Sequence, residues 1–160
     1  MFYIVMEFNM LKNIIKNKNY SFFDNASDYK DAIHKSCETF EKNGVVSENY
    51  KYEIVKCVEK YGPYIVLMPG VCMPHSQEGG ENVFKTDISF TRFNEKIIFD
   101  ENDEDSWAKV FFTLASVNHD EHLENMQKLT EILSNEEMIE ELINCDNEET
   151  LKKISEKYDL

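Results

Sequence analysis

The stretch GPYIVLMPGVCMPHS at Gly62–Ser76 constrains the fold most, because short apolar runs and turn signals alternate within it. The run Tyr64–Met68 is too short for a helix of its own and is typical of a buried strand. The Pro69-Gly70 pair predicts a turn directly after this strand. A second apolar run then ends at His75, which follows a stiff, non-helical proline. This order holds one imidazole at a strand end, where it is both rigid and reachable.

Length and composition indicate one folded domain. The 160 residues are enough to bury a substantial core, and 42% hydrophobic with 12% aromatic residues is typical of a folded protein. The net charge of −14 argues against binding to nucleic acid or to acidic membrane surfaces, since each needs a basic footprint. It favours a basic protein partner, because opposite charges speed association.

The sequence predicts a cytoplasmic protein without membrane insertion. No segment reaches the roughly 20 apolar residues that a membrane-spanning helix requires. The run Phe2–Met6 is too short for a signal-peptide core and has no basic flank before it. The cysteines form no Cys-x-x-Cys pair, and we expect them to be reduced, small fillers of the core. They are Cys37, Cys57, Cys72 and Cys145.

Apolar residues at helical spacing predict several helices, most of them preceded by a capping residue. The expected caps are Ser27, Ser47, Asn118 and Ser134. The expected segments are a short helix within Asn13–Asn25, a helix from Ser27 to Lys42, a helix that carries the stripe Tyr50, Ile54, Cys57 and Tyr61, a helix from Asn118, and helices at Glu136–Asn144 and Glu148–Tyr158.

Runs rich in β-branched and aromatic residues predict the strands between these helices. They are an extended piece at Tyr20–Phe23 and strands at Tyr64–Met68, Phe84–Phe93, Lys96–Phe99 and Lys109–Val117. The last strand is apolar on both faces, which indicates a central strand covered by helices on both sides. The order of helices, strands and helices predicts an α/β fold with a mixed sheet.

The Gly-Pro-Tyr opening, the Pro-Gly step and the Met-Pro-His close of Gly62–Ser76 resemble a known motif. It is the active-site motif of the mannitol/fructose-type enzyme IIA proteins of the bacterial phosphoenolpyruvate-dependent sugar phosphotransferase system, and it looks closest to their ascorbate-type branch. The resemblance implies a central mixed sheet of about five strands flanked by helices. It assigns residues 11–160 to one enzyme IIA domain and leaves residues 1–10 as an N-terminal extension.

The resemblance also implies a role for two histidines. In the family, the histidine at the position of His75 carries a phosphoryl group, and a second active-site histidine maps to His122. An imidazole suits this chemistry because its neutral nitrogen is nucleophilic near physiological pH. Periodicity alone does not choose between His122 and His119, which lie on roughly the same helical face.

Other polar residues have ordinary explanations. Taken by spacing alone, a Pro-His pair is most often an ordinary polar pair at a strand end. The His-Asp-Glu-His order does not match zinc-protease helices, which place histidines four apart with a glutamate beside the first, and we expect no metal and no cofactor. His34 lies off the apolar stripe of its helix and is expected to be solvated. Cys72 is expected to be structural, because nothing near it lowers the pKa of a thiol.

The chain departs from the family motif at two points. Small residues flank Met-Pro-His in the family, often alanine before and glycine after, whereas this chain has Cys72 and Ser76. Both are still small, so access for a partner is retained. The basic residue that the family carries shortly after the histidine has no counterpart in Ser76–Gly80, which removes a cationic contact to a phosphoryl group. A contact from Ser76 or Gln77 is a further expectation.

By resemblance, the chain is a cytoplasmic phosphocarrier. It accepts a phosphoryl group on His75 from phosphorylated HPr and passes it to a cysteine of enzyme IIB, which serves a membrane permease IIC for an ascorbate-like or other sugar. The alternative is a phosphorylation-state regulatory module that controls other proteins without a transport role. The same active-site residues serve both.

Overall fold

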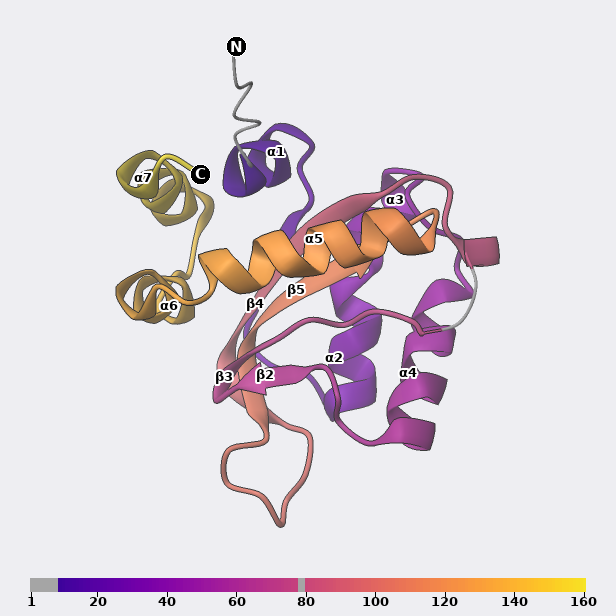
Figure 1. Ribbon diagram of the computed structural model, residues 1–160. Coiled ribbons are helices and arrows are strands. Elements are labelled where there is room, and N and C mark those ends of the chain that lie inside the picture. The colour runs from indigo at the N-terminus through magenta and orange to yellow at the C-terminus, as the bar shows by residue number, and fades with distance from the viewer. Residues whose placement is uncertain (1–8, 78–79) are drawn as a thin grey trace.

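Five strands form one mixed sheet, which is covered by helices on both faces (Figure 1). The computed structural model describes residues 9–77 and 80–160. In spatial order the strands are β1 (Tyr20–Phe23), β4 (Asp87–Ile98), β5 (Trp107–Ala115), β3 (Gly70–Cys72) and β2 (Val66–Met68). The pairs β1–β4 and β3–β5 are parallel, whereas β4–β5 and β2–β3 are antiparallel. The predicted α/β fold with a mixed sheet is confirmed.

Each face of the sheet has its own core. Valine and phenylalanine side chains on one face of β5, such as Val110 and Phe112, pack under α1 (Met10–Lys16), α5 (His119–Ile132), α6 (Glu136–Ile143) and α7 (Glu148–Tyr158). The opposite face, with Phe111 and Ala115, packs against α2 (Tyr29–Ser36), α3 (Glu38–Lys42) and α4 (Tyr50–Tyr61). The prediction of a central strand covered on both sides is confirmed by β5.

The strand predicted at Tyr64–Met68 as buried is instead an edge strand. It is shorter, Val66–Met68, and its Leu67 side chain is 38% exposed. The turn at Pro69-Gly70 folds the chain back, so that the following β3 takes the interior position beside β5 and is buried at all three residues. The predicted turn is in the right place, but no strand was predicted at Gly70–Cys72, and the apolar pattern did not show that this segment is the buried one.

The strands predicted at Phe84–Phe93 and Lys96–Phe99 are a single strand, β4. Its pairing with β5 shifts between Arg92 and Ile97, so an irregularity accommodates the polar residues that appeared to separate two strands. Phe84, where the first of these strands was predicted to begin, lies before β4 and is 64% exposed.

The helix predicted from Ser27 to Lys42 is divided at Cys37 into α2 and α3. Asp28 rather than Ser27 caps α2, since its carboxylate accepts a hydrogen bond from the Asp31 N–H at 2.8 Å. Both Cys37 and Phe40 remain buried, so the break keeps the apolar face on the core.

Two other predicted caps are also wrong by one or more residues. Asn49 precedes α4, while the Ser47 hydroxyl donates to Asn82 at 2.8 Å, and Asn135 rather than Ser134 caps α6. Tyr61, expected on the buried stripe of α4, is 48% exposed. The Asn118 cap and the range Glu148–Tyr158 are confirmed.

Helix α1 packs against α7 and the C-terminal residue. Helix α1 begins at Met10, whose side chain is buried in the same core as α7, and the Lys12 N–H donates to the Leu160 carbonyl at 2.7 Å. The remaining residues of the expected N-terminal extension, 1–8, lie outside the described residues.

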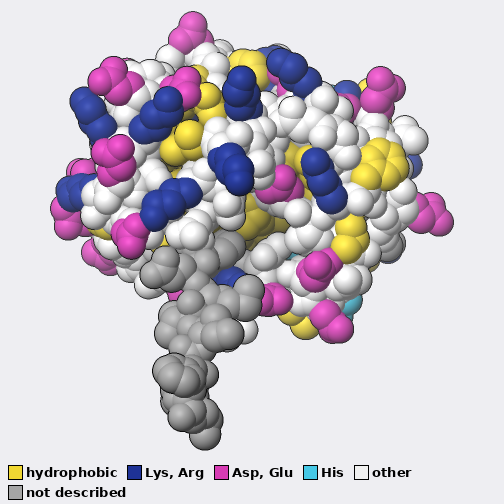
Figure 2. Space-filling model, turned by 90° about the horizontal axis from the view of Figure 1, so that it is seen from above, with side chains coloured by type: hydrophobic (Ala, Val, Ile, Leu, Met, Phe, Trp, Pro, Cys, Tyr) yellow, Lys and Arg dark blue, Asp and Glu magenta, His cyan; other side chains and the backbone are white. Residues whose placement is uncertain are grey.

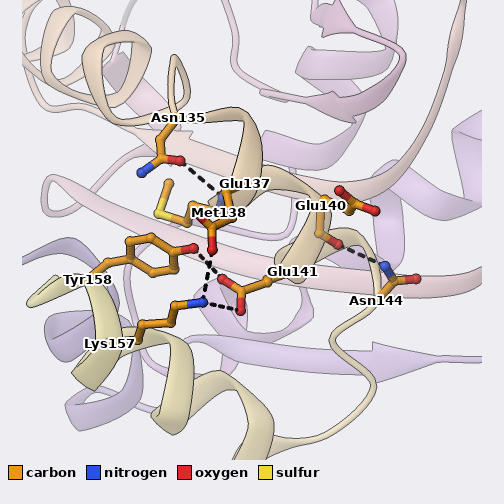
Figure 3. A network of polar contacts seen from close by, with 8 residues as sticks. All are labelled: Asn135, Glu137, Met138, Glu140, Glu141, Asn144, Lys157 and Tyr158. Atoms are coloured by element: carbon orange, nitrogen blue, oxygen red, sulfur yellow. Dashed lines mark hydrogen bonds and ion pairs between the residues drawn. The ribbon is translucent and has the colours of Figure 1, made fainter.

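Helices α6 and α7 are joined at their surface by a charged network (Figure 3). The Lys157 ammonium lies between Glu137 and Glu141, at 3.1 and 2.9 Å, and the Tyr158 hydroxyl also donates to Glu141. Exposed pairs of this kind contribute little each, so the buried apolar residues of α6 and α7 hold these helices on the sheet.

On the face seen in Figure 2, basic and acidic side chains are interspersed rather than gathered in separate patches, although the chain is strongly acidic as a whole. None of the helices in the part of the chain that the structure describes is long and apolar enough to cross a membrane.

The hairpin that leads to His75 depends on Gly70, and we predict that Gly70→Ala destabilises the protein. Gly70 has a φ of +100°, and a Cβ added there would lie 2.7 Å from Cδ1 of Ile143. Positive φ costs a non-glycine residue about 1–2 kcal/mol, and the crowding adds about 1 kcal/mol more. Gly44→Ala is the matched control, because Gly44 has a φ of +70° with nothing within 4 Å of the added Cβ. Urea unfolding should show the larger loss for Gly70→Ala; equal losses would contradict this reading.

Candidate active site

The parallel pairing of β3 with β5 brings two distant parts of the chain to one edge of the sheet. The carboxyl ends of parallel neighbours lie at the same edge, which is where α/β proteins commonly place their sites. Here β3 runs into Pro74 and His75, and β5 runs into Ser116 and the start of α5. The Leu114 N–H donates to the Pro74 carbonyl at 2.9 Å, so the chain after β3 stays attached to β5 as far as the histidine.

The His75 imidazole is held by its own backbone. Its Nδ1 lies 2.6 Å from the Met73 carbonyl oxygen. A carbonyl only accepts, so Nδ1 carries the proton and Nε2 is left as the nitrogen with a free lone pair. The side chain is 5% exposed, and the Tyr64 ring packs against it edge-on, with the ring centroids 5.1 Å apart. The site therefore presents a neutral, oriented imidazole.

His122, the second histidine to which the family resemblance points, lies beside His75. Their ring centroids are 5.0 Å apart with the planes at 44°. His122 lies in the first turn of α5, whose start is fixed by the Asn118 side chain, which accepts from the Glu121 N–H at 2.9 Å. The Ser116 hydroxyl lies 3.3 Å from Nδ1 of His122. The two histidines predicted from the sequence therefore meet, although 46 residues of chain separate their positions 75 and 122.

Both imidazoles are kept neutral at physiological pH. Burial lowers the pKa of His75 to about 4; the hydrogen bond to Met73 opposes this shift and the neighbouring His122 adds to it. Burial also lowers the pKa of His122, and the neighbouring His119 lowers it further. A neutral imidazole keeps its lone pair, which is the form that acts as a nucleophile.

A cavity of about 610 Å³ opens over the two rings. Its described lining combines hydroxyl, amide and imidazole groups with apolar side chains, and none of these lining residues is Lys, Arg, Asp or Glu. His119 lines the cavity too, but its side chain is exposed. A group that enters here meets the hydroxyl, amide and imidazole groups of the described lining.

The other residues considered from the sequence either lie away from the two imidazoles or only line the cavity. Burial raises the pKa of the Cys72 thiol, and the side chain is fully buried, in line with a structural role. The Ser76 hydroxyl lies 3.8 Å from the Cys57 sulfur, while Gln77 lines the cavity. His34 is not solvated as expected, because its ring packs on Tyr52 with centroids 4.9 Å apart. Among the described residues, no group of three or more His, Cys, Asp or Glu side chains is placed to hold a metal ion.

Sequence reasoning did not assign three residues that shape this site. Tyr50 was seen only as part of an apolar stripe, Tyr64 only as part of the motif, and Ser116 not at all. Ser116 reaches the cavity through the pairing of β5 with β3, and Tyr50 reaches it through the packing of α4 on the sheet. Periodicity reports neither. For Tyr64 the sequence did offer an indication of a role at the site, because Tyr64 is the tyrosine of the Gly-Pro-Tyr opening of the motif.

Comparison with known proteins identifies the family. Residues 13–158 match the family described as phosphoenolpyruvate-dependent sugar phosphotransferase system, EIIA 2. The chain belongs to this family, and the resemblance seen in the motif is confirmed.

The relatives include more than one branch. The chain is 32% identical over 145 residues to the mannitol-specific cryptic phosphotransferase enzyme IIA component of Escherichia coli K12, covering 90% of this chain and 96% of that protein. It is 28% identical to the ascorbate-specific PTS system EIIA component of Shigella boydii, covering 86% and 88%. The relatives thus confirm the family that the motif indicated, and they include mannitol-type as well as ascorbate-type proteins.

The fold is shared with solved enzyme IIA structures. The complex of mannitol enzyme IIA and phosphorylated mannitol enzyme IIB from Escherichia coli contains a chain that aligns with a TM-score of 0.75 at 23% identity, covering 88% of this chain and 95% of that one. The chain thus shares the fold of a solved enzyme IIA protein.

The buried neutral His75 makes the stability of the protein depend on pH. Because its pKa falls from 6.5 to about 4 on folding, the unfolded chain binds a proton in this interval that the folded chain does not. Stability is therefore full above pH 6.5 and falls as the pH drops towards 4, by up to about 3 kcal/mol from this group. Urea unfolding at pH 7.5 and pH 4.5 should show a smaller pH dependence for His75→Gln than for the wild type. An identical dependence would show that His75 does not titrate as described.

Proposed function

We propose that this chain is a phosphocarrier that accepts a phosphoryl group from phosphorylated HPr on Nε2 of His75 and passes it to a cysteine of enzyme IIB. The observation that carries the proposal is the 2.6 Å hydrogen bond from Nδ1 of His75 to the Met73 carbonyl, which leaves Nε2 as the nucleophile. Membership of the enzyme IIA family supports the reaction class, and the complex of a similarly folded protein with phosphorylated enzyme IIB supports the acceptor.

The proposed reaction consists of two displacements at phosphorus. In the first, the lone pair of Nε2 attacks the phosphorus of the donor phosphohistidine; the new N–P bond forms as the donor N–P bond breaks, and the donor imidazole leaves with its electron pair. In the second, a thiolate of enzyme IIB attacks the same phosphorus and the electron pair of the N–P bond returns to Nε2. Catalysis of this kind rests on alignment and on donors to the phosphoryl oxygens.

His122 is the proposed donor to those oxygens. If the Ser116 hydroxyl donates to Nδ1 of His122, at 3.3 Å, then Nε2 of His122 carries the proton and can donate it in a hydrogen bond. The ring lies against His75, so the donor is next to the nitrogen that would carry the phosphoryl group. Because the described lining contains no Lys or Arg, this neutral donor would provide a larger share of the hydrogen bonding to the phosphoryl oxygens.

We predict that His75→Gln abolishes phosphorylation. The chain would be incubated with phosphoenolpyruvate, enzyme I and HPr, and acid-labile phosphate would be located by mass spectrometry. The wild type should carry one phosphoryl group on His75, and the matched control His34→Gln should behave like the wild type, because His34 packs on Tyr52 away from the cavity. Label on His75→Gln at the wild-type level would refute the assignment.

The second step is tested by adding a mannitol-type enzyme IIB to the labelled chain. Label that leaves His75 supports relay to enzyme IIB, whereas label that stays on His75 favours the regulatory alternative.

We predict that His122→Ala slows transfer without preventing it. Loss of one donor to a developing charge costs about 100-fold to 1000-fold in rate. His122→Gln should recover part of the rate, because its amide also donates. Rapid-quench kinetics of label transfer from HPr measures both variants, with circular dichroism as the control for folding. A wild-type rate for His122→Ala would reduce this residue to a packing role.

A further inference from the structure

The peptide group that joins His75 to Ser76 is held at both of its polar atoms by tyrosine hydroxyls. The Tyr64 hydroxyl donates to the His75 carbonyl oxygen, and the Ser76 N–H donates to the Tyr50 hydroxyl oxygen at 3.3 Å. These tyrosines come from different places, Tyr50 from the start of α4 and Tyr64 from the segment before β2. One peptide plane is therefore fixed from two sides.

Tyr50 also connects this peptide to the central strand. Its own proton is donated to the Leu114 carbonyl at 2.6 Å, while the Leu114 N–H donates to the Pro74 carbonyl at 2.9 Å. The segment on both sides of His75 is thus attached to a single residue of β5, directly at Pro74 and through Tyr50 at Ser76. Tyr50 is 3% exposed and Leu114 is 1% exposed, so water has little access to replace these bonds.

The tyrosines remain hydrogen-bond donors at all physiological pH values. Burial raises the pKa of the Tyr50 hydroxyl and of the Tyr64 hydroxyl above its ordinary value. Tyr64 has a second contact, since its ring packs edge-on to the imidazole with the planes at 86°. It therefore acts on the backbone and on the ring of the same histidine.

We propose that Tyr50 and Tyr64 are positioning residues for His75, which fix the His75–Ser76 peptide so that Nε2 meets the incoming phosphoryl group in line. The imidazole keeps its Nδ1 bond to Met73 only while the backbone at residues 73–76 holds one conformation, because both groups belong to the same short segment. The rate part of this inference rests on the proposed function, whereas the state of the imidazole does not.

The test uses Tyr50→Phe and Tyr64→Phe, which retain the rings and remove only the hydroxyls. A displacement of about 1 Å at a reacting group lowers rates by about 100-fold, so we expect a loss of about 10-fold to 100-fold in maximal transfer rate. The KM for phosphorylated HPr should not change, because both variants keep the aromatic ring that lines the cavity and lose only a hydroxyl that is bonded to the peptide. The matched controls are Tyr52→Phe and Tyr61→Phe, whose side chains are 52% and 48% exposed.

A second readout separates positioning from general stability. In ¹⁵N-labelled protein, long-range ¹H–¹⁵N correlation spectra should show His75 of the wild type in the single tautomer with the proton on Nδ1. Each tyrosine variant should show a mixture of tautomers, and the controls should not. Since both hydroxyls hold one peptide, the double variant should lose less rate than the product of the two single losses.

Wild-type rates with one sharp His75 tautomer in both variants would overturn the proposal. Slower transfer with an unchanged His75 tautomer would overturn it as well, because the loss would then come from elsewhere in the fold. Failure of the wild type to accept label from charged HPr would refute the proposed function instead, and the tautomer spectra would still decide the role of the tyrosines. If one variant does not fold, as judged by its circular dichroism, the other tests the same peptide.

Discussion

The site depends on the parallel pairing of β3 with β5. This pairing is short, with partners from Gly70 and Ala108 to Cys72 and Phe111, yet it sets where both histidine-bearing segments leave the sheet. The bond from the Leu114 N–H to the Pro74 carbonyl extends the attachment by two residues beyond β3. Because β5 is buried on both faces by separate cores, it gives the segment before His75 a rigid support that an edge strand would not provide.

The environment of His75 favours the neutral imidazole and is not arranged around a fixed positive charge. The ring is buried, its Nδ1 proton is committed to Met73, and the described lining of the cavity contains no charged side chain. Such a site suits a nucleophile that must keep its lone pair, but it does little to neutralise a phosphoryl dianion. Under the proposed function, basic groups of the donor or the acceptor protein would supply compensating charge, and the net charge of −14 favours such partners.

Sequence reasoning reached the fold class and the two histidines, but for different reasons. The helix ranges followed from periodicity, whereas His75 and His122 were selected by a family motif and not by geometry. The expected five strands matched in number because two errors offset each other: β3 was missed and β4 was divided at Asn94. Local patterns do not show which strand of a hairpin faces inward, nor whether polar residues interrupt a strand or fit into a shift in its register. Caps were misplaced where neighbouring polar residues compete, as at Ser27 and Asp28.

The same nitrogen has to serve both proposed transfers, and this limits how the partners bind. His75 is 5% exposed, Nδ1 is occupied, and Nε2 is the one ring nitrogen with a free lone pair. A donor and an acceptor that both react at Nε2 must therefore use the opening of the cavity one after the other. A partner that dissociated slowly would block the next transfer. The contact surfaces therefore have to align the reacting groups and still allow fast dissociation. Under the proposed function, the precision of the reaction then comes from within the chain, where the hydrogen bond to Met73 holds the imidazole and those to Tyr50 and Tyr64 hold the peptide group that follows it.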